Sequence, residues 1–311
     1  MCDVPGIKVG HIQDMAARTG CTVILPDWPV IASADIRGFA PGTRELALLE
    51  PSRQISHIHA LVLTGGSAFG LDSACGVVQF LEEQGIGYDT GAARVPIVPA
   101  AVIYDLAVGS SNIRPDRQMG YRAAQSATAA PCGQGLVGAG AGATVGKFAG
   151  QRWAMAGGVG SCSAVIDQQV FIGALVVVNA LGNIIDHKTG KTIAGAYDPL
   201  RKQFIDPLQF LAEPQSISFA HMANTTLAVV ATSACLTKTE AQRLARVATN
   251  GITRATFPAH TPFDGDVVFV ISTAQHPPVD LIRLGVMAEE LVAAAIVKAI
   301  HLSNHLSPAP G

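Results

Sequence analysis

The chain has 311 residues, which is enough for one large domain or two small ones with a substantial buried core. Its formal net charge of −2 gives no electrostatic reason to expect binding to nucleic acid or to an anionic membrane. Hydrophobic residues make up 49% of the chain and charged residues only 14%, which favours a homo-oligomer whose subunit contacts cover apolar surface.

The cysteines and histidines do not form a recognisable metal motif. The six cysteines are scattered without a C-x-x-C pair, and the nine histidines include no H-E-x-x-H, so neither a metal nor another cofactor is expected. The longest apolar runs, such as residues 291–297, are far shorter than the roughly 20 residues of a membrane-spanning helix. The first residues lack the basic and apolar regions of a signal peptide, so a cytoplasmic location is expected.

The first half of the chain begins with short strands and continues with a strand, a tight turn and a helix. Residues 60–64 predict the strand, residues 65–70 the turn and residues 71–83 the helix. The N–H groups of Gly66 and Ser67 lie where a helix begins, and could bind an anion or the developing oxyanion of a substrate. Ser67 is not a hydrolase elbow serine, because the G-x-S-x-G motif would need glycine where Phe69 stands.

The middle of the chain contains three further candidate residues. Tyr104 stands near the end of an extended apolar segment, and Lys147 ends a glycine-rich run that does not have the spacing of a phosphate-binding loop. Residues 158–165 and 170–179 predict a pair of strands, of which the second ends at Asn179. Residues 186–224 are rich in lysine, proline and turn residues, which predicts a linker.

The last third of the chain predicts alternating strands and helices. A β-branched, apolar strand begins at Thr225, and Thr237 and Glu240 have the spacing of a capping box that opens a helix ending near residue 250. A strand over residues 267–272 and an alanine-rich helix over residues 280–301 follow. Strands and helices occur in both orders, so the fold class is α/β (α+β), arranged as a layered sandwich.

The junction between Asn224 and Thr225 allows two interpretations. It can be a loop that meets a strand, or it can be a bond that is cleaved, which would leave Thr225 with a hydroxyl nucleophile and an amine base on one residue. Asp264 and Asp266 are two residues apart, so in extended backbone both carboxylates would face the same side. The Asp-Gly pair is also a common turn signal, so spacing alone leaves both interpretations open.

Ordered motifs along nearly the whole chain resemble the P1 family of N-terminal-nucleophile hydrolases. That family includes L-aminopeptidase/D-esterase enzymes, β-peptidyl aminopeptidases and the 6-aminohexanoate-oligomer endohydrolase, or nylon hydrolase. The matching segments are residues 3–11, 19–23, 35–45, 63–72, 95–100, 138–147, 224–232, 236–238 and 260–266. A threonine after asparagine, together with Lys147, is most similar to the nylon-hydrolase branch.

The resemblance implies an αββα sandwich and a single domain, residues 1–311, that cleaves itself into an α chain (1–224) and a β chain (225–311). It implies that Thr225 is the nucleophile and that Asp264 and Asp266 form its supporting network. It also implies that Lys147, Tyr104 and Asn179 line the same site. A tetramer of αβ units is the assembly expected from the family.

These residues suffice for amide hydrolysis without a cofactor. The Thr225 hydroxyl would attack the carbonyl group of Asn224, and the freed amine, with an ordinary pKa of about 8, would then act as base. A positive charge on Lys147 would lower the pKa of that amine. Asn179, in preference to Tyr104, would hold the oxyanion.

The expected substrate is a small or oligomeric linear amide, with 6-aminohexanoate (nylon) oligomers or polyamide first. Alternatives are a β-peptidyl or L-aminopeptidase, a D-aminoacyl esterase or amidase, and a pantetheine-type amide hydrolase. A non-cleaving homologue with a binding or structural role is the alternative from a different class.

Overall fold

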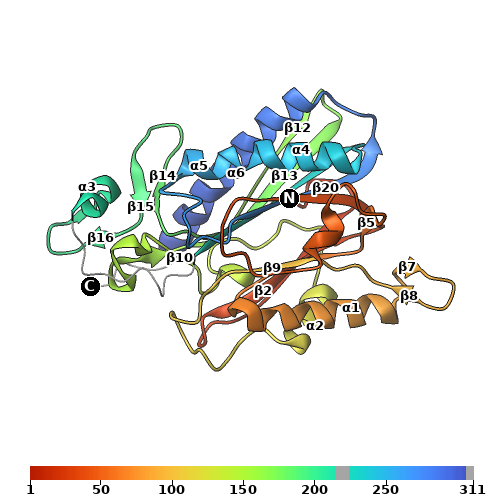
Figure 1. The fold of residues 1–311 in the computed structure, drawn as a ribbon, viewed down its shortest axis with the longest axis horizontal. Helices are drawn as coiled ribbons and strands as arrows, with labels where there is room; N and C mark the ends of the chain where they lie inside the picture. The colour runs from red at the N-terminus through yellow and green to blue at the C-terminus, as the bar shows by residue number, and fades with distance from the viewer. Residues whose placement is uncertain (214–223, 306–311) are drawn as a thin grey trace.

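Two β-sheets packed face to face form the centre of the molecule, and helices cover the outer face of each sheet (Figure 1). The computed structural model describes residues 1–213 and 224–305. The resulting order of layers is α, β, β, α. The αββα sandwich expected from the sequence is therefore confirmed.

The first sheet has five strands and is covered by α1 (Ser73–Glu83) and α2 (Arg117–Gln125). Its pairs are antiparallel except for the parallel pair β6–β9. In spatial order, the strands are β1 (Ile7–Asp14), β2 (Thr19–Pro26), β6 (Leu61–Thr64), β9 (Ala100–Val102) and β4 (Thr43–Arg44).

The second sheet has six strands and is covered by α4 (Lys238–Ala248), α5 (Asn250–Ala255) and α6 (Leu281–His305). The pair β18–β20 is parallel, and the other pairs are antiparallel. In spatial order, the strands are β12 (Gly158–Ile166), β13 (Val170–Asn179), β18 (Thr225–Ala234), β20 (Val267–His276), β3 (Val30–Ile36) and β5 (His57–Ile58).

Strand β18 lies in the middle of the second sheet because its sequence suits burial on both faces. All ten residues are buried, and Thr, Val and Ala dominate the strand. β-branched side chains of this kind pack well on a pleated surface with neighbours on each side. Its register pairs Thr225 with Asn179 of β13 and Leu227 with Val267 of β20. The strand therefore fixes its first residue, Thr225, between β13 and the segment that leads into β20.

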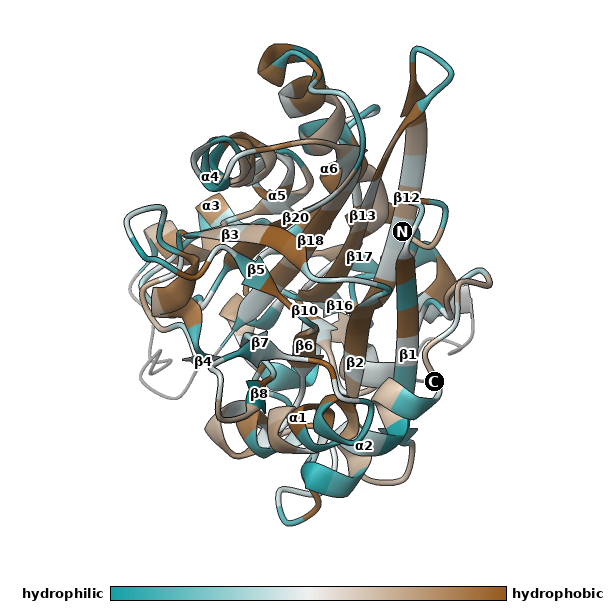
Figure 2. Cartoon of the chain, turned by 90° about the vertical axis from the view of Figure 1, so that its right-hand side faces the viewer, coloured by the Kyte–Doolittle hydropathy of each residue, from teal (hydrophilic) through white to brown (hydrophobic). Residues whose placement is uncertain are grey.

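Three apolar clusters fill the spaces between the four layers. One lies between the two sheets, one between the second sheet and α4–α6, and one between the first sheet and α1–α2. Figure 2 shows hydrophobic colouring concentrated on the central strands, whereas the outer face of α2 is hydrophilic. Among the helices of the described chain, none combines the length and the apolar character needed to span a bilayer.

Several boundaries differ from those expected. The first predicted helix begins at Ser73 and not at residue 71, after a 3₁₀ turn over Ser67–Asp72. The capping box of Thr237 and Glu240 is confirmed, but a break after Ala248 separates α4 from α5.

Part of the predicted linker is ordered secondary structure, and its residues 214–223 lie outside the described chain. The ordered part holds β15 (Thr192–Ala194), β16 (Tyr197–Asp198), β17 (Gln203–Phe204) and α3 (Pro207–Ala212). Strands β14 (Asn183–Ile185) and β19 (Thr256–Phe257) join β15 in a small sheet. The prediction of a linker was therefore wrong for these residues: β16 pairs with β17, β15 pairs with β14, and α3 is a helix. The remaining short pairs are β7 (Tyr88–Asp89) with β8 (Arg94–Val95), and β10 (Thr144–Val145) with β11 (Met155–Ala156).

Close packing of α6 on β12 yields a test of the outer layer. A Cβ atom added at Gly160 of β12 would lie 1.9 Å from the carbonyl oxygen of Ala295 on α6. We expect Gly160→Ala to lower the free energy of unfolding by about 1–3 kcal/mol, because helix and strand must separate to make room. At the control position, Gly133, the nearest atoms lie 3.6 Å away, so Gly133→Ala should change stability by about 0.5 kcal/mol or less. Urea unfolding of both variants measures this, and equal losses would contradict the packing argument.

Candidate active site

The peptide bond between Asn224 and Thr225 lies where β18 and the segment that leads into β20 begin to run side by side. Asn224 forms a parallel bridge with Asp264, and its N–H donates to the carbonyl oxygen of Phe263 at 3.2 Å. The carbonyl oxygen of Asn224 accepts the N–H of Gly265 at 2.8 Å and also the hydroxyl of Thr225. A hydroxyl nucleophile and a main-chain donor therefore meet at one buried carbonyl group.

Gly265 fits this position because it has no side chain. A Cβ atom there would lie 2.8 Å from the Thr225 hydroxyl oxygen and 2.7 Å from the carbonyl oxygen of Ala40. Sequence reasoning treated Gly265 only as part of a turn signal. Its position between Asp264 and Asp266 could have identified it. A residue between two candidate carboxylates also brings its own N–H group close to the site.

A glycine- and proline-rich loop that follows β3 holds the Asp264–Asp266 segment from the other side. The N–H of Ala40 donates to the carbonyl oxygen of Asp264 at 2.9 Å. The N–H groups of Arg37 and Gly38 donate to the carbonyl oxygen of Asp266 at 3.0 and 3.2 Å. These main-chain bonds fix the direction in which both aspartate side chains leave the backbone.

Asp266 connects the start of β18 to a histidine that sequence reasoning missed. One carboxylate oxygen of Asp266 accepts the N–H of Thr226 at 2.6 Å. The other accepts the main-chain N–H of His260 at 3.3 Å and lies 2.8 Å from its Nδ1. His260 adopts a left-handed conformation with φ 55°, which is uncommon for a residue other than glycine. The carboxylate thus has donors on both of its oxygens.

Asp264 lies in a different environment from Asp266, although both are buried. One of its carboxylate oxygens accepts the N–H of Thr261 at 2.6 Å. Burial, reinforced by the negative charge of Asp266, raises the pKa of Asp264 to about 6, although Thr261 and Lys147 act in the opposite direction. Two neighbouring carboxylates with different surroundings are suited to different proton-carrying roles.

Lys147 is buried in the same region and joins the network through Asn179. Its ammonium group donates to the main-chain oxygen of Asn179 at 3.0 Å and to the side-chain oxygen at 2.8 Å. Burial lowers the pKa of Lys147 to about 7, and the carboxylates that partly offset this shift are those of Asp264, Asp105 and Asp266. Near neutral pH the amine is therefore present in both protonation states.

Asn179 lies opposite Thr225 in the sheet, and both its amide oxygen and its amide nitrogen form hydrogen bonds within this network. Its amide oxygen also accepts the N–H of Thr144 at 3.0 Å, and its amide nitrogen donates to the carbonyl oxygen of Tyr104 at 3.2 Å. The structure thus brings five of the six predicted catalytic residues together in one region: Thr225, Asp264, Asp266, Lys147 and Asn179. Tyr104 joins the network through its main chain.

Gly66 and Ser67 differ from expectation, because their N–H groups are already occupied. The N–H of Gly66 donates to the carboxylate of Asp105 at 2.7 Å, and that of Ser67 donates to the carbonyl oxygen of Ile103 at 3.0 Å. The other carboxylate oxygen of Asp105 accepts the Thr19 hydroxyl at 2.7 Å. The anion at this turn is thus the carboxylate of Asp105. The expectation that these two N–H groups bind substrate was wrong. Asp105 is a buried group that the sequence did not reveal.

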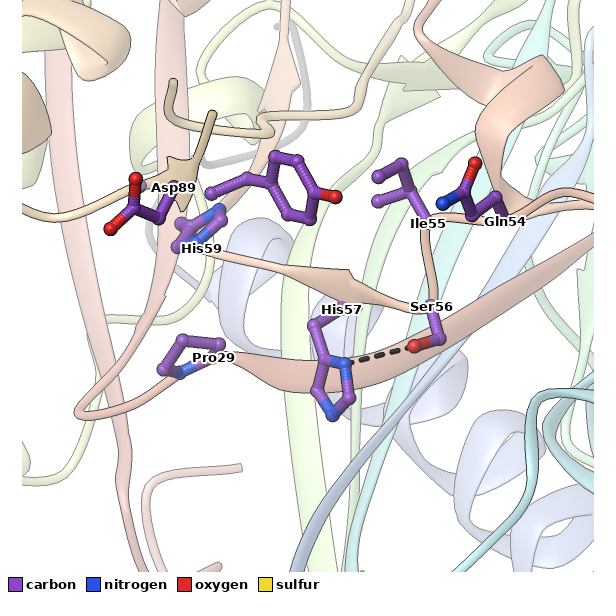
Figure 3. Close-up of a pocket in the computed structure, with 9 residues that line it drawn as sticks. Pro29, Gln54, Ile55, Ser56, His57, His59 and Asp89 are labelled. Atoms are coloured by element: carbon purple, nitrogen blue, oxygen red, sulfur yellow. Dashed lines mark hydrogen bonds between the residues drawn. The ribbon is translucent and has the colours of Figure 1, made fainter. Parts of the chain in front are cut away.

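A separate pocket lies between the edge strand β5 and the β7–β8 hairpin (Figure 3). In it His59 is buried, and its Nδ1 accepts the N–H of Ile97 at 3.0 Å. Burial lowers the pKa of His59 from its ordinary value. The cavity measures about 500 Å³ and is lined by Pro29, Gln54, Ile55, Ser56, His57, His59, Gly87, Tyr88 and Asp89. It contains none of the predicted catalytic residues, so it is distinct from the site around Thr225.

The groups around Thr225 are suited to acyl transfer. They comprise a hydroxyl, a main-chain donor on the adjacent carbonyl oxygen, two carboxylates and a lysine with a lowered pKa. Within residues 1–213 and 224–305, no group of three or more His, Cys, Asp and Glu side chains could hold a metal ion.

Comparisons with known proteins agree with this chemistry. The profile of peptidase family S58 matches residues 1–307. An uncharacterized aminopeptidase of Mycobacterium tuberculosis is 41% identical over 287 residues, which cover 87% of this chain and 80% of the relative. A 6-aminohexanoate-oligomer endohydrolase of Kocuria sp. is 29% identical over 312 residues, which cover 96% of this chain and 84% of the relative.

Solved structures share the fold at lower sequence identity. The L-aminopeptidase D-Ala-esterase/amidase of Ochrobactrum anthropi, described as a variant of the Ntn hydrolase fold, superposes with a TM-score of 0.72 at 20% identity, covering 97% of this chain and 85% of that one. A β-aminopeptidase of Burkholderia sp. superposes with a TM-score of 0.68 at 21% identity, covering 96% and 85%. The match over residues 1–307, with the relative at 41% identity, shows that the chain belongs to peptidase family S58 and is an amide hydrolase.

Proposed function

We propose that this chain cleaves itself between Asn224 and Thr225 and then hydrolyses linear amides through an acyl-enzyme on Thr225. The observation that carries the proposal is the arrangement at the Asn224 carbonyl oxygen, where the Thr225 hydroxyl and the Gly265 N–H meet. The products of self-cleavage would be residues 1–224 and 225–311.

Self-cleavage needs only groups that surround this bond. The Thr225 hydroxyl oxygen attacks the carbonyl carbon of Asn224, and the Gly265 N–H stabilises the negative charge that develops on the carbonyl oxygen. The C–N bond then breaks, the amine of Thr225 takes a proton, and an ester joins Asn224 to the Thr225 oxygen. Water hydrolyses the ester, which leaves a free carboxylate on Asn224 and a free hydroxyl and amine on Thr225.

After cleavage, the Thr225 amine is the base in the proposed mechanism. Because burial lowers the pKa of Lys147 to about 7, the lysine competes for protons in the same range as the new amine. Each protonated amine lowers the pKa of the other, which favours a neutral base on Thr225. Asp264 and Asp266 balance the positive charge that remains, and Asn179 stays the candidate to hold the oxyanion of the acyl-enzyme steps.

The proposed substrates are linear amides. Oligomers of 6-aminohexanoate remain the first candidate because relatives with this named activity align along 96% of the chain. Aminoacyl amides are the second candidate because relatives at 41% identity are named aminopeptidases. A release assay that compares 6-aminohexanoate oligomers, β-alanyl amides and L- or D-aminoacyl amides separates these classes.

Replacing Thr225 tests the nucleophile. We expect Thr225→Ala to remain a single chain and to hydrolyse no amide, because the attacking oxygen is gone. Thr226→Ala is the matched control, since it removes the neighbouring hydroxyl from the same buried strand. Denaturing electrophoresis should resolve two fragments in the wild type and in Thr226→Ala. Amide hydrolysis by Thr225→Ala would rule out this nucleophile.

The lowered pKa of Lys147 makes a prediction about stability in the uncleaved Thr225→Ala chain. A lysine whose pKa falls on folding contributes stability that is fully present above its unfolded pKa of 10.5 and is lost progressively as pH falls from there to its folded pKa of about 7. The free energy of unfolding of Thr225→Ala should therefore rise from pH 7 towards pH 10.5. This rise should exceed that of the Thr225→Ala/Lys147→Met double variant by on the order of a few kcal/mol. Urea unfolding across this range measures the difference. Equal pH slopes would contradict a buried, neutralised Lys147.

Variants at His260 test whether its bond to Asp266 supports self-cleavage. Asn and Gly both tolerate the left-handed conformation at this position, but only Asn offers a side-chain donor. We expect His260→Gly to slow self-cleavage by about 10-fold or more, the value of a lost charge-assisted hydrogen bond. His260→Asn should retain most of the rate. The half-life of the full-length chain gives the readout, and equal rates in both variants would assign His260 no role beyond its backbone conformation.

A further inference from the structure

A buried carboxylate, that of Asp105, joins three segments of the first sheet. Asp105 follows β9 and is 3% exposed. One of its carboxylate oxygens accepts the N–H of Gly66, in the turn after β6, and the other accepts the hydroxyl of Thr19, at the start of β2; both distances are 2.7 Å. The side chain therefore ties the ends of β9, β6 and β2 together, and the proposed mechanism uses none of its atoms.

The space around this carboxylate is bounded by glycines, so it fits a group of one size. A Cβ atom on Gly65 would lie 2.0 Å from a carboxylate oxygen of Asp105 and 2.6 Å from the Thr19 hydroxyl oxygen. A Cβ atom on Gly142 would lie 2.8 Å from the Asp105 Cβ. Burial raises the pKa of Asp105, whereas the Gly66 N–H and the Thr19 hydroxyl act in the opposite direction. These two donors thus offset part of the cost of burying the charge.

The peptide bond before Asp105 carries the contact that reaches the candidate active site. The carbonyl oxygen of Tyr104 accepts an N–H of the Asn179 side-chain amide at 3.2 Å. This carbonyl group lies in one plane with the Cα atom of Asp105, because the peptide unit is rigid and planar. Holding Asp105 in place therefore holds the direction of the Tyr104 carbonyl group.

Main-chain bonds fix the chain on either side of this peptide unit. The N–H of Ile103 donates to the carbonyl oxygen of Thr64 at 2.8 Å, and the carbonyl oxygen of Asp105 accepts the N–H of Val108 at 2.9 Å. The first bond fixes the chain before Tyr104, and the second fixes the turn after Asp105. The carboxylate supplies the connection to β2 and to the turn after β6 between these two points.

Asn179 depends on a fixed orientation because both ends of its amide group are used. Its oxygen accepts the N–H of Thr144 and the ammonium group of Lys147 at 3.0 and 2.8 Å. Its nitrogen carries two N–H groups, of which one donates to Tyr104 and the second is the donor that the proposed function assigns to the oxyanion. Asn179 lies opposite Thr225 in the sheet, so a rotation of the amide would change the direction of this donor beside the nucleophile.

We propose that Asp105 is a positioning residue for amide hydrolysis, which fixes the Tyr104 carbonyl group and through it the side-chain amide of Asn179. The inference rests on the proposed function, in which Asn179 holds the oxyanion. Loss of a contact that acts only in the transition state lowers kcat and kcat/KM equally and leaves KM unchanged. A carboxylate with a purely structural role would instead change the amount of folded enzyme and leave kcat per folded molecule as it is.

The first test compares Asp105→Ala with Asp105→Asn in the amide release assay. Asn has the same shape, and its amide oxygen can accept the Gly66 N–H while its nitrogen donates to the Thr19 hydroxyl oxygen. We expect Asp105→Ala to lower kcat per folded molecule by about 10-fold or more with KM within about 2-fold, and Asp105→Asn to retain most of kcat. Unchanged kcat in Asp105→Ala would overturn the proposal.

Thr19→Val is a milder variant, which removes one donor at nearly constant size and takes the place of Asp105→Ala if that variant does not fold. It should lower kcat by about 3-fold, the value of one hydrogen bond. Thr22→Val is the matched control, because it removes another buried hydroxyl from β2, one that contacts His11 and the N–H of Ala139. It should keep the wild-type kcat, and an equal loss in both threonine variants would count against Asp105.

A double-variant cycle tests whether Asp105 acts through Asn179. Asn179→Ala removes the donor assigned to the oxyanion and should lower kcat by about 100-fold. Adding Asp105→Ala should then lower kcat by less than about 2-fold more, because the group to be positioned is gone. Losses that multiply in the double variant would overturn the proposal.

The position of the Asn179 amide can be measured without any activity. Crystal structures of Thr225→Ala, alone and combined with Asp105→Ala or Asp105→Asn, give the distance between Asn179 Nδ2 and the Tyr104 oxygen. We expect the 3.2 Å contact to be kept with Asp105→Asn and lost with Asp105→Ala. A contact that survives Asp105→Ala would overturn the proposal, whereas amide hydrolysis by Thr225→Ala would refute the proposed function and leave this structural comparison to decide the role of Asp105.

Discussion

The parallel pairing of β18 with β20 is the constraint on which the candidate site depends. Parallel neighbours begin at the same edge of a sheet, so the first residues of β18 meet the segment that leads into β20. This brings the Asn224 carbonyl group to the Gly265 N–H and the Thr226 N–H to the Asp266 carboxylate. A shift of one residue in this register would exchange the side chains that face the site for those on the other face of the sheet.

Burial then determines how charge is distributed around Thr225. Lys147 lies among carboxylates from two separate parts of the chain, Asp105 and the Asp264–Asp266 segment, and the four-layer packing keeps water away from them. Desolvation moves the pKa values of Lys147 and Asp264 towards neutrality from opposite directions. Groups that titrate close to neutral pH can exchange protons with little energetic cost, which general acid–base chemistry requires.

Much of the fold and part of the site could be predicted from the sequence. Hydrophobic periodicity indicated the central strands. The two-residue spacing made Asp264 and Asp266 candidates, and the family resemblance, not the spacing, gave them and Lys147 a role in the site. His260 and Asp105 were missed, because their roles depend on hydrogen bonds to residues that local patterns do not connect, in the case of Asp105 a residue 39 positions away. The same limit explains why the Gly66 N–H was expected to be free.

The order of strands in the second sheet has a consequence for how a cleaved chain would come apart. Strands β18 and β20, which follow the bond between Asn224 and Thr225, lie between β13 and β3, which precede it. Helix α6, also from the later part, covers β12 and β13. Two fragments interleaved in this way separate only when the centre of the sheet opens. Once apart they would have to find each other again by diffusion, so cleavage would turn a folding reaction of one chain into an association of two, with heat inactivation that becomes irreversible on dilution.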